Sequence, residues 1–407
     1  MALADLIDLT QKKFKKERPD SEINFNLAID EKPVSGLITH NPQLEFLLDR
    51  RFLAYGRFYL GYGKKSSGKT SMFYEFAKFI QAQGGDVVWL ETENAADLEY
   101  ARKQGVDLSR MIIQHPNTLE EALALGELYV RNMPKAYPDG DTPVLIAIDS
   151  VGIGTEYEVE AGNTVQNIQP GIHARILSRW YREMVGPLSK EKCIFLMLNQ
   201  LKQKIGAIGY GDDVGDSLLG GEAQFFYSTY HWKFTKIQEM TAKDAFGAER
   251  KIGSRHRIQG KRNKLGREGK GQEAEFDLYI EGGVDWWSPL VRKLGDKYSG
   301  LLQKSGGFYY WKPPNTEYIN TLPTGEQQKL IIDTEKAFRE AELASILANS
   351  PQGCDLIRAN FGLPELPAPE VVEEVEKERK IKRKKKASLE SEEPVETTRG
   401  VKSKLSQ

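Results

Sequence analysis

A glycine-rich segment carries the clearest chemical signal in the chain. It reads GKKSSGKT, which is a glycine, four residues and then Gly-Lys-Thr. This spacing is typical of a loop whose backbone N–H groups surround phosphates, with the lysine reaching the β- and γ-phosphates and the hydroxyl binding Mg²⁺. An apolar run precedes it and a helical pattern follows it, as such a loop requires. The predicted nucleotide-binding residues here are Gly63, Lys64, Lys65, Ser66, Ser67, Gly68, Lys69 and Thr70.

Acidic residues end two other apolar runs. The sequence VLIAIDS places Asp149 where a buried strand would end. Ligands of α/β sheets bind at the carboxyl ends of the strands, so Asp149 is a candidate for holding magnesium together with Thr70. A second run, Asp86–Leu90, leads into ETEN, where a carboxylate could orient an attacking water. Spacing alone does not choose between Glu91 and Glu93.

The composition excludes several classes of protein. The 407 residues include 57 basic and 58 acidic side chains, so binding to nucleic acid would need a local patch rather than overall charge. Two cysteines, Cys193 and Cys354, are too few for a disulfide scaffold or a four-cysteine zinc site. The longest apolar runs have the length of strands, and the N-terminus lacks a signal-peptide pattern. We therefore expect a cytoplasmic protein that does not bind membranes.

The pattern of apolar and charged residues divides the chain into four parts. Residues 1–35 contain an amphipathic helix over 3–17 and a polar linker, and the apolar stripe of this helix needs the main domain or another copy of the chain to cover it. Residues 36–283 alternate strands and helices. Residues 284–365 form a smaller α+β unit, and the charged residues 366–407 are predicted to be disordered.

The second part indicates the fold class. Apolar strands separated by helices are typical of an α/β fold with a mostly parallel sheet that helices cover on both faces. Strands are expected at 58–62, 86–91, 111–114, 144–148 and 193–198, and helices at 70–84, 97–104, 118–133 and 171–189. Later strands are expected to join the sheet in antiparallel orientation at Ala223–Thr235, Ser254–Arg262 and Gln272–Tyr279.

Several segments together resemble the RecA recombinases. They follow the order and nearly the spacing of that family over residues 3–310, and the set is particular to it although other ATPases share the phosphate loop. The N-terminal ALADLIDLTQKKFKKE is similar to the helix through which the family polymerises. The other matching segments read GKKSSGKT, ETENAADLEYARKQGVDLSRMIIQHPNTLEEAL, IDSVGIG, LNQLKQKIG, LLGGEAQFFYS, KRNK and AEFDLYIEGGVD.

The resemblance implies a RecA-type ATPase core and assigns roles around the nucleotide. It implies Glu93 as the catalytic glutamate, acting with Lys69. Gln200, after the strand at 193–198, would begin a long loop, sense the γ-phosphate and couple it to DNA binding, since an amide can both donate and accept. Asp97 and Tyr100 match the residues that contact and stack on adenine, and their spacing puts both on one side of a helix start.

The resemblance also implies contacts between subunits. The sequence KRNK matches the family's pair of lysines that reach the γ-phosphate held by a neighbouring subunit. In this chain the pair is Arg262 and Lys264, and the arginine keeps the charge. Phe226 matches an interface phenylalanine. Judged without the family, KRNK is equally a basic surface run and Phe226 is more often a core residue.

Two segments match the family's DNA-binding loops. The first, about Glu156–Gly171, leads into a helix on which two arginines seven residues apart share one face, although such a face is equally a solvated surface. The second, residues 201–219, contains two lysines, but it is longer than in the family and has three aspartates that repel DNA phosphates. The implied DNA-binding residues are Arg175, Ser178, Arg182, Lys202, Lys204, Gly220 and Gly221.

The chain departs from the family in two places. The family usually has Pro-Glu after the first glycine of the phosphate loop, whereas this chain has Lys64 and Lys65, which add positive potential there. RecA tails are acidic, whereas this tail alternates acidic and basic blocks. These departures suggest a phage-encoded relative of the UvsX type, which would act in the cytoplasm of a bacterial host.

The resemblance implies an ATP-dependent DNA recombinase. Such a protein binds ATP and Mg²⁺, forms a helical filament on single-stranded DNA and then pairs it with duplex DNA in recombination and repair, with mediator and single-strand-binding proteins as further partners. One alternative is a RecA-fold motor or regulatory ATPase that closes into a ring, because only the rotation per subunit separates a ring from a helix. Another is a DNA-binding paralogue that does not hydrolyse ATP.

Overall fold

The structure is a computed structural model that describes most of the chain in two compact units, Met1–Gly36 and Leu37–Gln407. In the first unit the predicted N-terminal helix is confirmed as α1 (Leu3–Glu17), in which Leu6 of the predicted apolar stripe and Leu9 outside it are both exposed. The helices of the described part include none that is long and apolar enough to cross a bilayer. The described residues are 3–19, 33–156, 171–203, 216–218, 220–266, 272–297, 302–311 and 337–349, with Cys354, Ile357 and Arg358.

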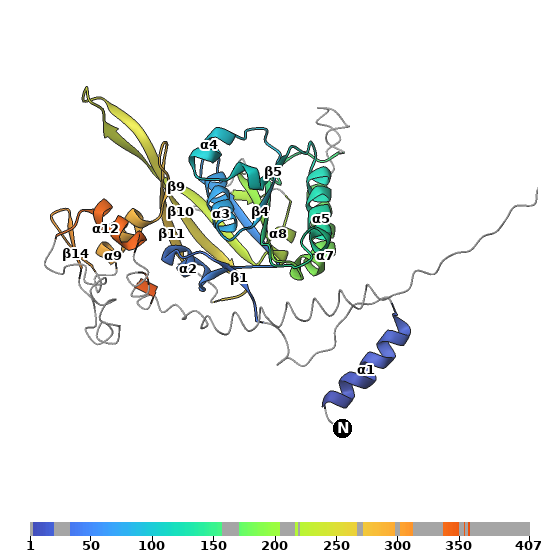
Figure 1. Cartoon of the computed structure of the whole chain (residues 1–407). Helices are drawn as coiled ribbons and strands as arrows, with labels where there is room; N and C mark the ends of the chain where they lie inside the picture. Colours follow the sequence, from blue (N-terminus) through green and yellow to red (C-terminus); the bar gives the residue numbers. More distant parts are fainter. Residues whose placement is uncertain are drawn as a thin grey trace, which may run out of the picture. The chain divides into compact units, whose positions relative to one another are not determined.

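A ten-stranded sheet forms the centre of the second unit (Figure 1). Six neighbouring strands, from β9 to β5, are parallel to one another, and β10, β11 and β12 continue the sheet in antiparallel orientation. A further strand, β8 (Asp216–Leu218), pairs with β7. The predicted α/β fold with a mostly parallel sheet is therefore confirmed. The order across the sheet is β12 (Gly283–Asp285), β11 (Glu273–Tyr279), β10 (Glu249–Asn263), β9 (Tyr230–Lys243), β3 (Arg57–Gly63), β7 (Cys193–Gln203), β6 (Val144–Asp149), β4 (Asp86–Glu91) and β5 (Met111–Gln114).

Two expectations about this sheet are wrong. The segment Ala223–Thr235 is not one strand, because its first residues form the short helix α8 (Ala223–Tyr227) before β9 begins. In addition, β9 is parallel to β3, with Trp232 opposite Gly61. The run of aromatic residues here reads as one strand because aromatic side chains of both α8 and β9 pack into the cores on the two sides of the sheet.

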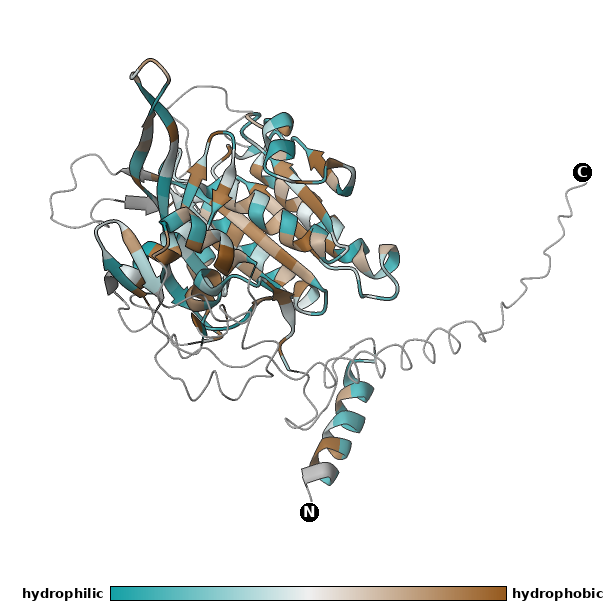
Figure 2. Cartoon of the chain, turned by 60° about the vertical axis from the view of Figure 1, so that its left-hand side comes forward, coloured by the Kyte–Doolittle hydropathy of each residue, from teal (hydrophilic) through white to brown (hydrophobic). Residues whose placement is uncertain are grey.

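Each face of the sheet has its own core, because successive residues of a strand point to opposite sides. Tyr59 belongs to the cluster that contains Phe73 and Phe76 of α3 (Lys69–Ala82). Phe58 and Leu60 belong to the other cluster, with residues of α5 (Leu119–Ala136) and α7 (Ile172–Ser189). Helix α3 therefore covers one face and α5 and α7 cover the other (Figure 1). Figure 2 shows the apolar residues gathered on the central strands.

Strands β9 and β10 continue past their neighbours as a hairpin that projects from the sheet (Figure 1). Buried residues of β9 are confined to its first half, up to Phe234. At the tip, Phe246 is 92% exposed. The base of this hairpin belongs to the core, whereas its outer part is largely hydrophilic (Figure 2).

The remaining elements surround this core. Four of them, with Leu290, Leu294 and Leu343, make a separate small cluster: α9 (Trp287–Lys297), β13 (Leu302–Ser305), β14 (Phe308–Trp311) and α12 (Glu340–Ala348). The others are β1 (Gly36–Ile38), β2 (Phe52–Ala54), α2 (Pro42–Leu48), α4 (Leu98–Lys103) and a 3₁₀ turn at Leu108–Arg110. The predicted tail, 366–407, lies outside the described residues, and the four-part domain division stays a prediction.

Candidate functional site

The GKKSSGKT segment connects β3 to α3 at the carboxyl end of the parallel strands. Gly63 ends β3, and a Cβ there would lie 2.4 Å from the carbonyl oxygen of Phe234. Gly68 precedes α3 with a φ of 95°, and a Cβ there would lie 2.9 Å from Phe276 and 3.1 Å from His256. Both positions therefore require glycine, because the loop bends over β9, β10 and β11.

The loop borders a cavity of about 310 Å³ at this end of the sheet. Residues of the phosphate loop meet side chains from β6, β7 and the turn after β4 there. The position agrees with the rule that ligands of α/β sheets bind outside the carboxyl ends of the strands. The predicted residues that line it are Lys65, Ser66, Ser67, Gly68, Lys69, Thr70, Glu93, Asp149 and Gln200.

Lys69 is buried, and its ammonium contacts only neutral oxygens among its hydrogen-bond partners. Its Nζ donates to the carbonyl oxygens of Gly63 at 3.3 Å and of Lys64 at 3.1 Å. Burial lowers the pKa of Lys69, and the charges of Asp149 and Glu93 oppose that shift. The hydroxyl of Ser67 is also buried and has no hydrogen-bond partner in the described structure. A buried cation and an unsatisfied hydroxyl beside a cavity fit a phosphate group.

Thr70 and Asp149 lie side by side, as a shared magnesium site requires. The Thr70 hydroxyl donates to Oδ2 of Asp149 at 2.8 Å. Burial raises the pKa of Asp149 to about 6, although the Thr70 hydrogen bond and Lys69 lower it. Within the described ranges, no three acidic, histidine or cysteine side chains gather closely enough to hold a metal ion. One carboxylate and one hydroxyl suit Mg²⁺, which takes its other ligands from phosphates and water.

The structure separates the two glutamates that spacing left open. Glu93 lines the cavity, and its Oε1 accepts a hydrogen bond from Nε2 of Gln200. Glu91 points instead into its own turn and accepts from the backbone N–H of Glu93 at 3.0 Å and of Ala95 at 3.3 Å. Its other oxygen lies 3.1 Å from Nδ1 of His115. Glu93 is therefore the glutamate that faces the cavity beside the phosphate loop.

Gln200 does not begin a loop, so that expectation is wrong. It lies within β7, where it pairs with Gly63 of β3, and the strand continues to Gln203. Lys202 also belongs to β7, opposite Ser217 of β8, so the ends of the predicted second DNA-binding loop are strands. The ladder to β8 was not expected, because a glycine- and aspartate-rich segment carries little strand signal.

Asp97 and Tyr100 do not line the cavity. The carboxylate of Asp97 caps α4 by accepting from the backbone N–H of Tyr100 at 2.9 Å. Burial raises the pKa of Tyr100, while a hydrogen bond with Ser71, which does line the cavity, lowers it. The two residues thus lie next to the cavity, and their contact with adenine stays a prediction.

No local pattern in the sequence predicted the residues that β10 and the hairpin contribute to the cavity. His256 lies under the loop, donates through Nδ1 to the carbonyl oxygen of Ser67 at 2.9 Å and stacks on Phe276 with ring centroids 5.1 Å apart. Burial lowers the pKa of His256, which favours the neutral ring. Lys236 and Lys251 reach the cavity from the hairpin. Only strand register brings these residues to the loop, and no local pattern marks them.

Three of the predicted DNA-binding residues, Arg175, Ser178 and Arg182, share one face of α7. Arg175 and Arg182 are exposed there, and Nε of Arg182 donates to the carbonyl oxygen of Ser178 at 3.1 Å. Gly220 and Gly221 pack against the same helix. A Cβ on Gly220 would lie 2.3 Å from the Leu177 side chain, and one on Gly221 would lie 2.8 Å from that of Ala174. Lys204 and nearly all of the first predicted loop, residues 157–170, lie outside the described residues.

The predicted interface residues form a second surface, which we call the α8 surface: Phe226, Arg262 and Lys264. Phe226 is 64% exposed, and the Lys264 ammonium lies 5.6 Å from its ring centroid and donates to its carbonyl oxygen. Arg262 donates to the carbonyl oxygen of Phe225 at 2.8 Å. Burial first, and then Arg262, lower the pKa of Lys264.

The α8 surface does not border the phosphate-loop cavity of its own chain. The backbone of Lys264 bonds to Thr229, which in turn bonds to Phe58 near the start of β3. The loop begins at Gly63, five residues further along, which corresponds to about 17 Å of strand. None of the three α8-surface residues lines the cavity.

Comparisons with known proteins agree with this geometry. Residues 7–285 match the family model of the RecA N-terminal domain. The chain belongs to the RecA family. Its relatives include Protein RecA of Brucella canis and of Brucella abortus, each 32% identical over 274 residues, which is 67% of this chain and 69% of the relative. Protein RecA of Agrobacterium fabrum is 32% identical over 279 residues, covering 68% of this chain and 70% of the relative. The RecA-type fold is thus confirmed, and the phage origin stays a prediction.

Proposed function

We propose that this RecA-family protein is a DNA-dependent ATPase that forms filaments on single-stranded DNA and promotes pairing and strand exchange with duplex DNA in recombination and repair. The observation that carries the proposal is the contact between Glu93 and Gln200 in the cavity of the phosphate loop. A carboxylate that can activate water there touches an amide on the strand that leads toward the proposed DNA-binding residues.

The proposed hydrolytic roles follow from position and charge. Lys69 and the backbone of the loop bind the phosphates of ATP, and Thr70 and Asp149 hold the Mg²⁺ that accompanies them. Glu93 orients and deprotonates the attacking water. Gln200 donates its amide either to Glu93, as in this structure, or to the γ-phosphate. Charge neutralisation and positioning account for most of the catalysis of phosphoryl transfer.

The strand β7 connects this chemistry to the proposed DNA-binding side. Asn199, next to Gln200, donates to the Gln224 side chain of α8 at 2.9 Å. Helix α8 closely follows Gly220 and Gly221, which pack against Leu177 and Ala174 of α7, the helix that also carries Arg175. A shift of Gln200 toward a γ-phosphate would therefore act on both elements. The proposed DNA contacts are those of Arg175, Ser178, Arg182, Lys202 and Lys204.

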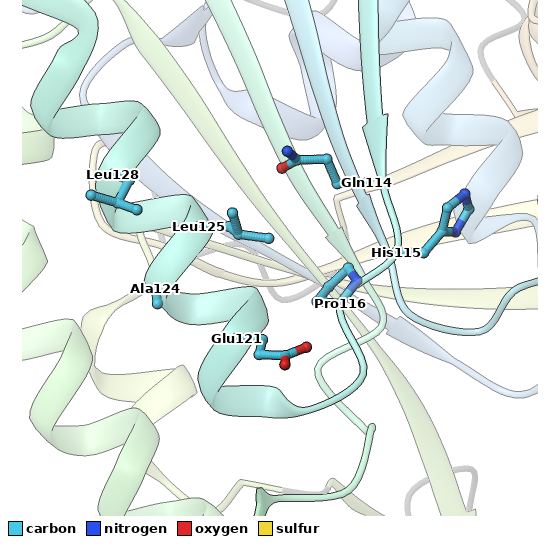
Figure 3. Close-up of a pocket in the computed structure, with 7 residues that line it drawn as sticks. All are labelled: Gln114, His115, Pro116, Glu121, Ala124, Leu125 and Leu128. Atoms are coloured by element: carbon cyan, nitrogen blue, oxygen red, sulfur yellow. The ribbon is translucent and has the colours of Figure 1, made fainter.

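Three surfaces support assembly of several copies. The α8 surface presents cations outside its own phosphate-loop cavity, so the phosphate that it reaches would belong to a neighbour. Helix α1 exposes Leu6 and Leu9. A groove of about 460 Å³ lies between the end of β5, the last strand of the sheet, and α5, with Leu128 exposed (Figure 3). We propose that these are contacts between copies in a filament, to which mediator and single-strand-binding proteins add further partners.

The first experiment measures ATP hydrolysis with and without single-stranded DNA and images the same samples by negative stain. Hydrolysis that DNA stimulates, together with helical filaments, is the expected result. Closed rings, or hydrolysis that ignores DNA, would favour the ring-forming motor or regulatory ATPase. DNA-bound filaments without hydrolysis would favour the non-hydrolysing paralogue.

A second experiment tests the DNA contacts on α7. The logarithm of the DNA-binding constant falls linearly with the logarithm of the salt concentration. Arg175→Ala and Arg182→Ala are each expected to make this slope shallower by about one, because each removes one phosphate contact. Arg131→Ala is the control, since Arg131 is an exposed arginine on a different helix, α5. Equal slopes for all three variants and the unmodified protein would contradict the assignment.

A further inference from the structure

The turn that carries Glu93 has few contacts of its own. Glu93, Asn94 and Ala95 are all exposed, and Asn94 has a φ of 51°. The start of the turn is anchored, because the Thr92 hydroxyl accepts from the backbone N–H of Ser150 at 2.7 Å and donates to its carbonyl oxygen at 2.8 Å. Beyond Thr92, the direction of Glu93 depends on what holds the next backbone groups.

The Glu91 carboxylate holds those groups. It is only 2% exposed, and one of its oxygens accepts from the N–H groups of both Glu93 and Ala95. Hydrogen bonds from N–H to a charged oxygen are about twice as strong as neutral ones. A buried carboxylate must also be fully bonded, so its geometry is well defined. Glu91 therefore closes the turn from inside the protein.

His115 orients the Glu91 carboxylate in turn. Its Nδ1 lies 3.1 Å from the second oxygen of Glu91, and it must donate because an ionised carboxylate only accepts. His115 follows β5 beside the groove at the edge of the sheet. Figure 3 shows its imidazole directed away from α5, whose Leu125 and Leu128 form the opposite wall. The contacts thus run from the wall of the groove through His115 and Glu91 to the backbone of Glu93.

We propose that Glu91 and His115 are positioning residues for Glu93 in ATP hydrolysis, an inference that rests on the proposed function. Glu91 fixes the turn through its two N–H bonds, and His115 fixes the orientation of Glu91. Neither residue lines the phosphate cavity. They therefore act on the rate of the chemical step and leave the binding of ATP unchanged.

The test compares kcat and KM for ATP on filaments saturated with single-stranded DNA. Glu91→Gln keeps the size of the side chain but replaces a charged acceptor by a neutral one, and kcat is expected to fall about tenfold with KM within about twofold of wild type. His115→Leu is expected to lower kcat about threefold. His115→Gln is expected to keep kcat near the wild-type value, because the amide can still donate to Glu91. Glu99→Gln, which removes an exposed acid from α4 nearby, is the control and is expected to leave kcat unchanged.

A double substitution separates positioning from damage to the fold. In a Glu93→Gln background, Glu91→Gln is expected to lower kcat no further, because Glu93 is the group through which Glu91 acts. An equal loss in both backgrounds, or a loss that appears in KM rather than kcat, would overturn the inference.

Amide hydrogen exchange tests the positioning without any need for hydrolysis. Exchange at Glu93 and Ala95 is expected to be at least about tenfold faster in Glu91→Gln, since the acceptor of both N–H groups is weakened. Unchanged exchange would overturn the inference even if the protein is an active ATPase. If wild type does not hydrolyse ATP, the proposed function fails, and the exchange rates alone then show whether Glu91 positions the turn.

Discussion

The phosphate cavity and the α8 surface each hold a lysine on backbone carbonyl oxygens, yet their surroundings differ. Lys69 is buried among Thr70, Asp149 and the carbonyls of its own loop. Lys264 is exposed and bonds to the carbonyl of Phe226, which is itself exposed. The side chains around Lys69 are brought together by the folding of one chain. The α8 surface presents charge and an aromatic ring at the surface, as expected of a site that only a neighbouring copy completes.

The largest expected effect tests the phosphate cavity. Glu93→Gln is expected to lower kcat for ATP by about 10²- to 10³-fold, because the amide cannot accept the proton of the attacking water. Binding of ATP should persist, since Lys69 and Thr70 are untouched. Single-turnover hydrolysis and nucleotide binding measured on the same sample check both statements. A variant that hydrolyses at the wild-type rate would show that the cavity does not work through Glu93.

The next effect tests the surface that needs a partner. Phe226→Ala, Arg262→Ala and Lys264→Ala are each expected to raise the protein concentration needed for filament formation about tenfold or more, because central aromatic and charged contacts dominate interfaces. The unfolding of the isolated chain should change little. Phe246→Ala is the control, because Phe246 is a still more exposed aromatic at the tip of the hairpin.

Light scattering or imaging against protein concentration measures this assembly. If Phe246→Ala weakens filament assembly as much as Phe226→Ala does, the loss of any exposed aromatic side chain explains the result. The α8 surface would then not be a specific site for a neighbouring copy.

Two glycine substitutions test how tightly the phosphate loop packs on the strands beneath it. Gly68→Ala is expected to cost about 2–3 kcal/mol of unfolding free energy, because the positive φ and the contacts with Phe276 and His256 both oppose a side chain. Gly84→Ala is the control with a φ of 73° and no atom within 4 Å of the added Cβ, and it should cost only about 1 kcal/mol. Denaturant melts of both variants measure the difference, and equal costs would show that the loop has room to move.

The smallest effect concerns a histidine under the α8 surface. His231 stacks edge-to-face on Phe225, and burial first and then the charge of Arg262 lower its pKa to about 4. Its neutral form is thus favoured in the folded state. The stability it contributes is present above its ordinary pKa of 6.5 and is lost as the pH falls through 6.5 toward 4.

The contribution lost by pH 5 is about 1–2 kcal/mol. His231→Gln should therefore remove part of the acid sensitivity seen in melts at pH 7.5 and 5. His40→Asn, at an exposed position, should keep the sensitivity of wild type. An acid sensitivity that is the same in His231→Gln and wild type would contradict the prediction.

The amino-acid sequence alone determined the phosphate loop and many of the helices and strands around it, because these depend on local patterns. Strands β4 and β5 begin and end where the sequence analysis placed them, and Asp149 ends β6 beside Thr70 as its strand pattern predicts. The GKKSSGKT loop between β3 and α3 likewise follows from neighbouring residues in the sequence. The resemblance to RecA added the choice of Glu93 over Glu91.

The tertiary structure decided which distant residues share the cavity, because strand register is set by packing over the whole sheet. It placed Gln200 inside β7 and brought His256 under the loop. It also directed the Glu91 carboxylate to the backbone N–H of Glu93. It also showed that Arg262 and Lys264 do not line the cavity of their own phosphate loop. Such relations arise between residues far apart in the chain, so no local spacing in the sequence carries them.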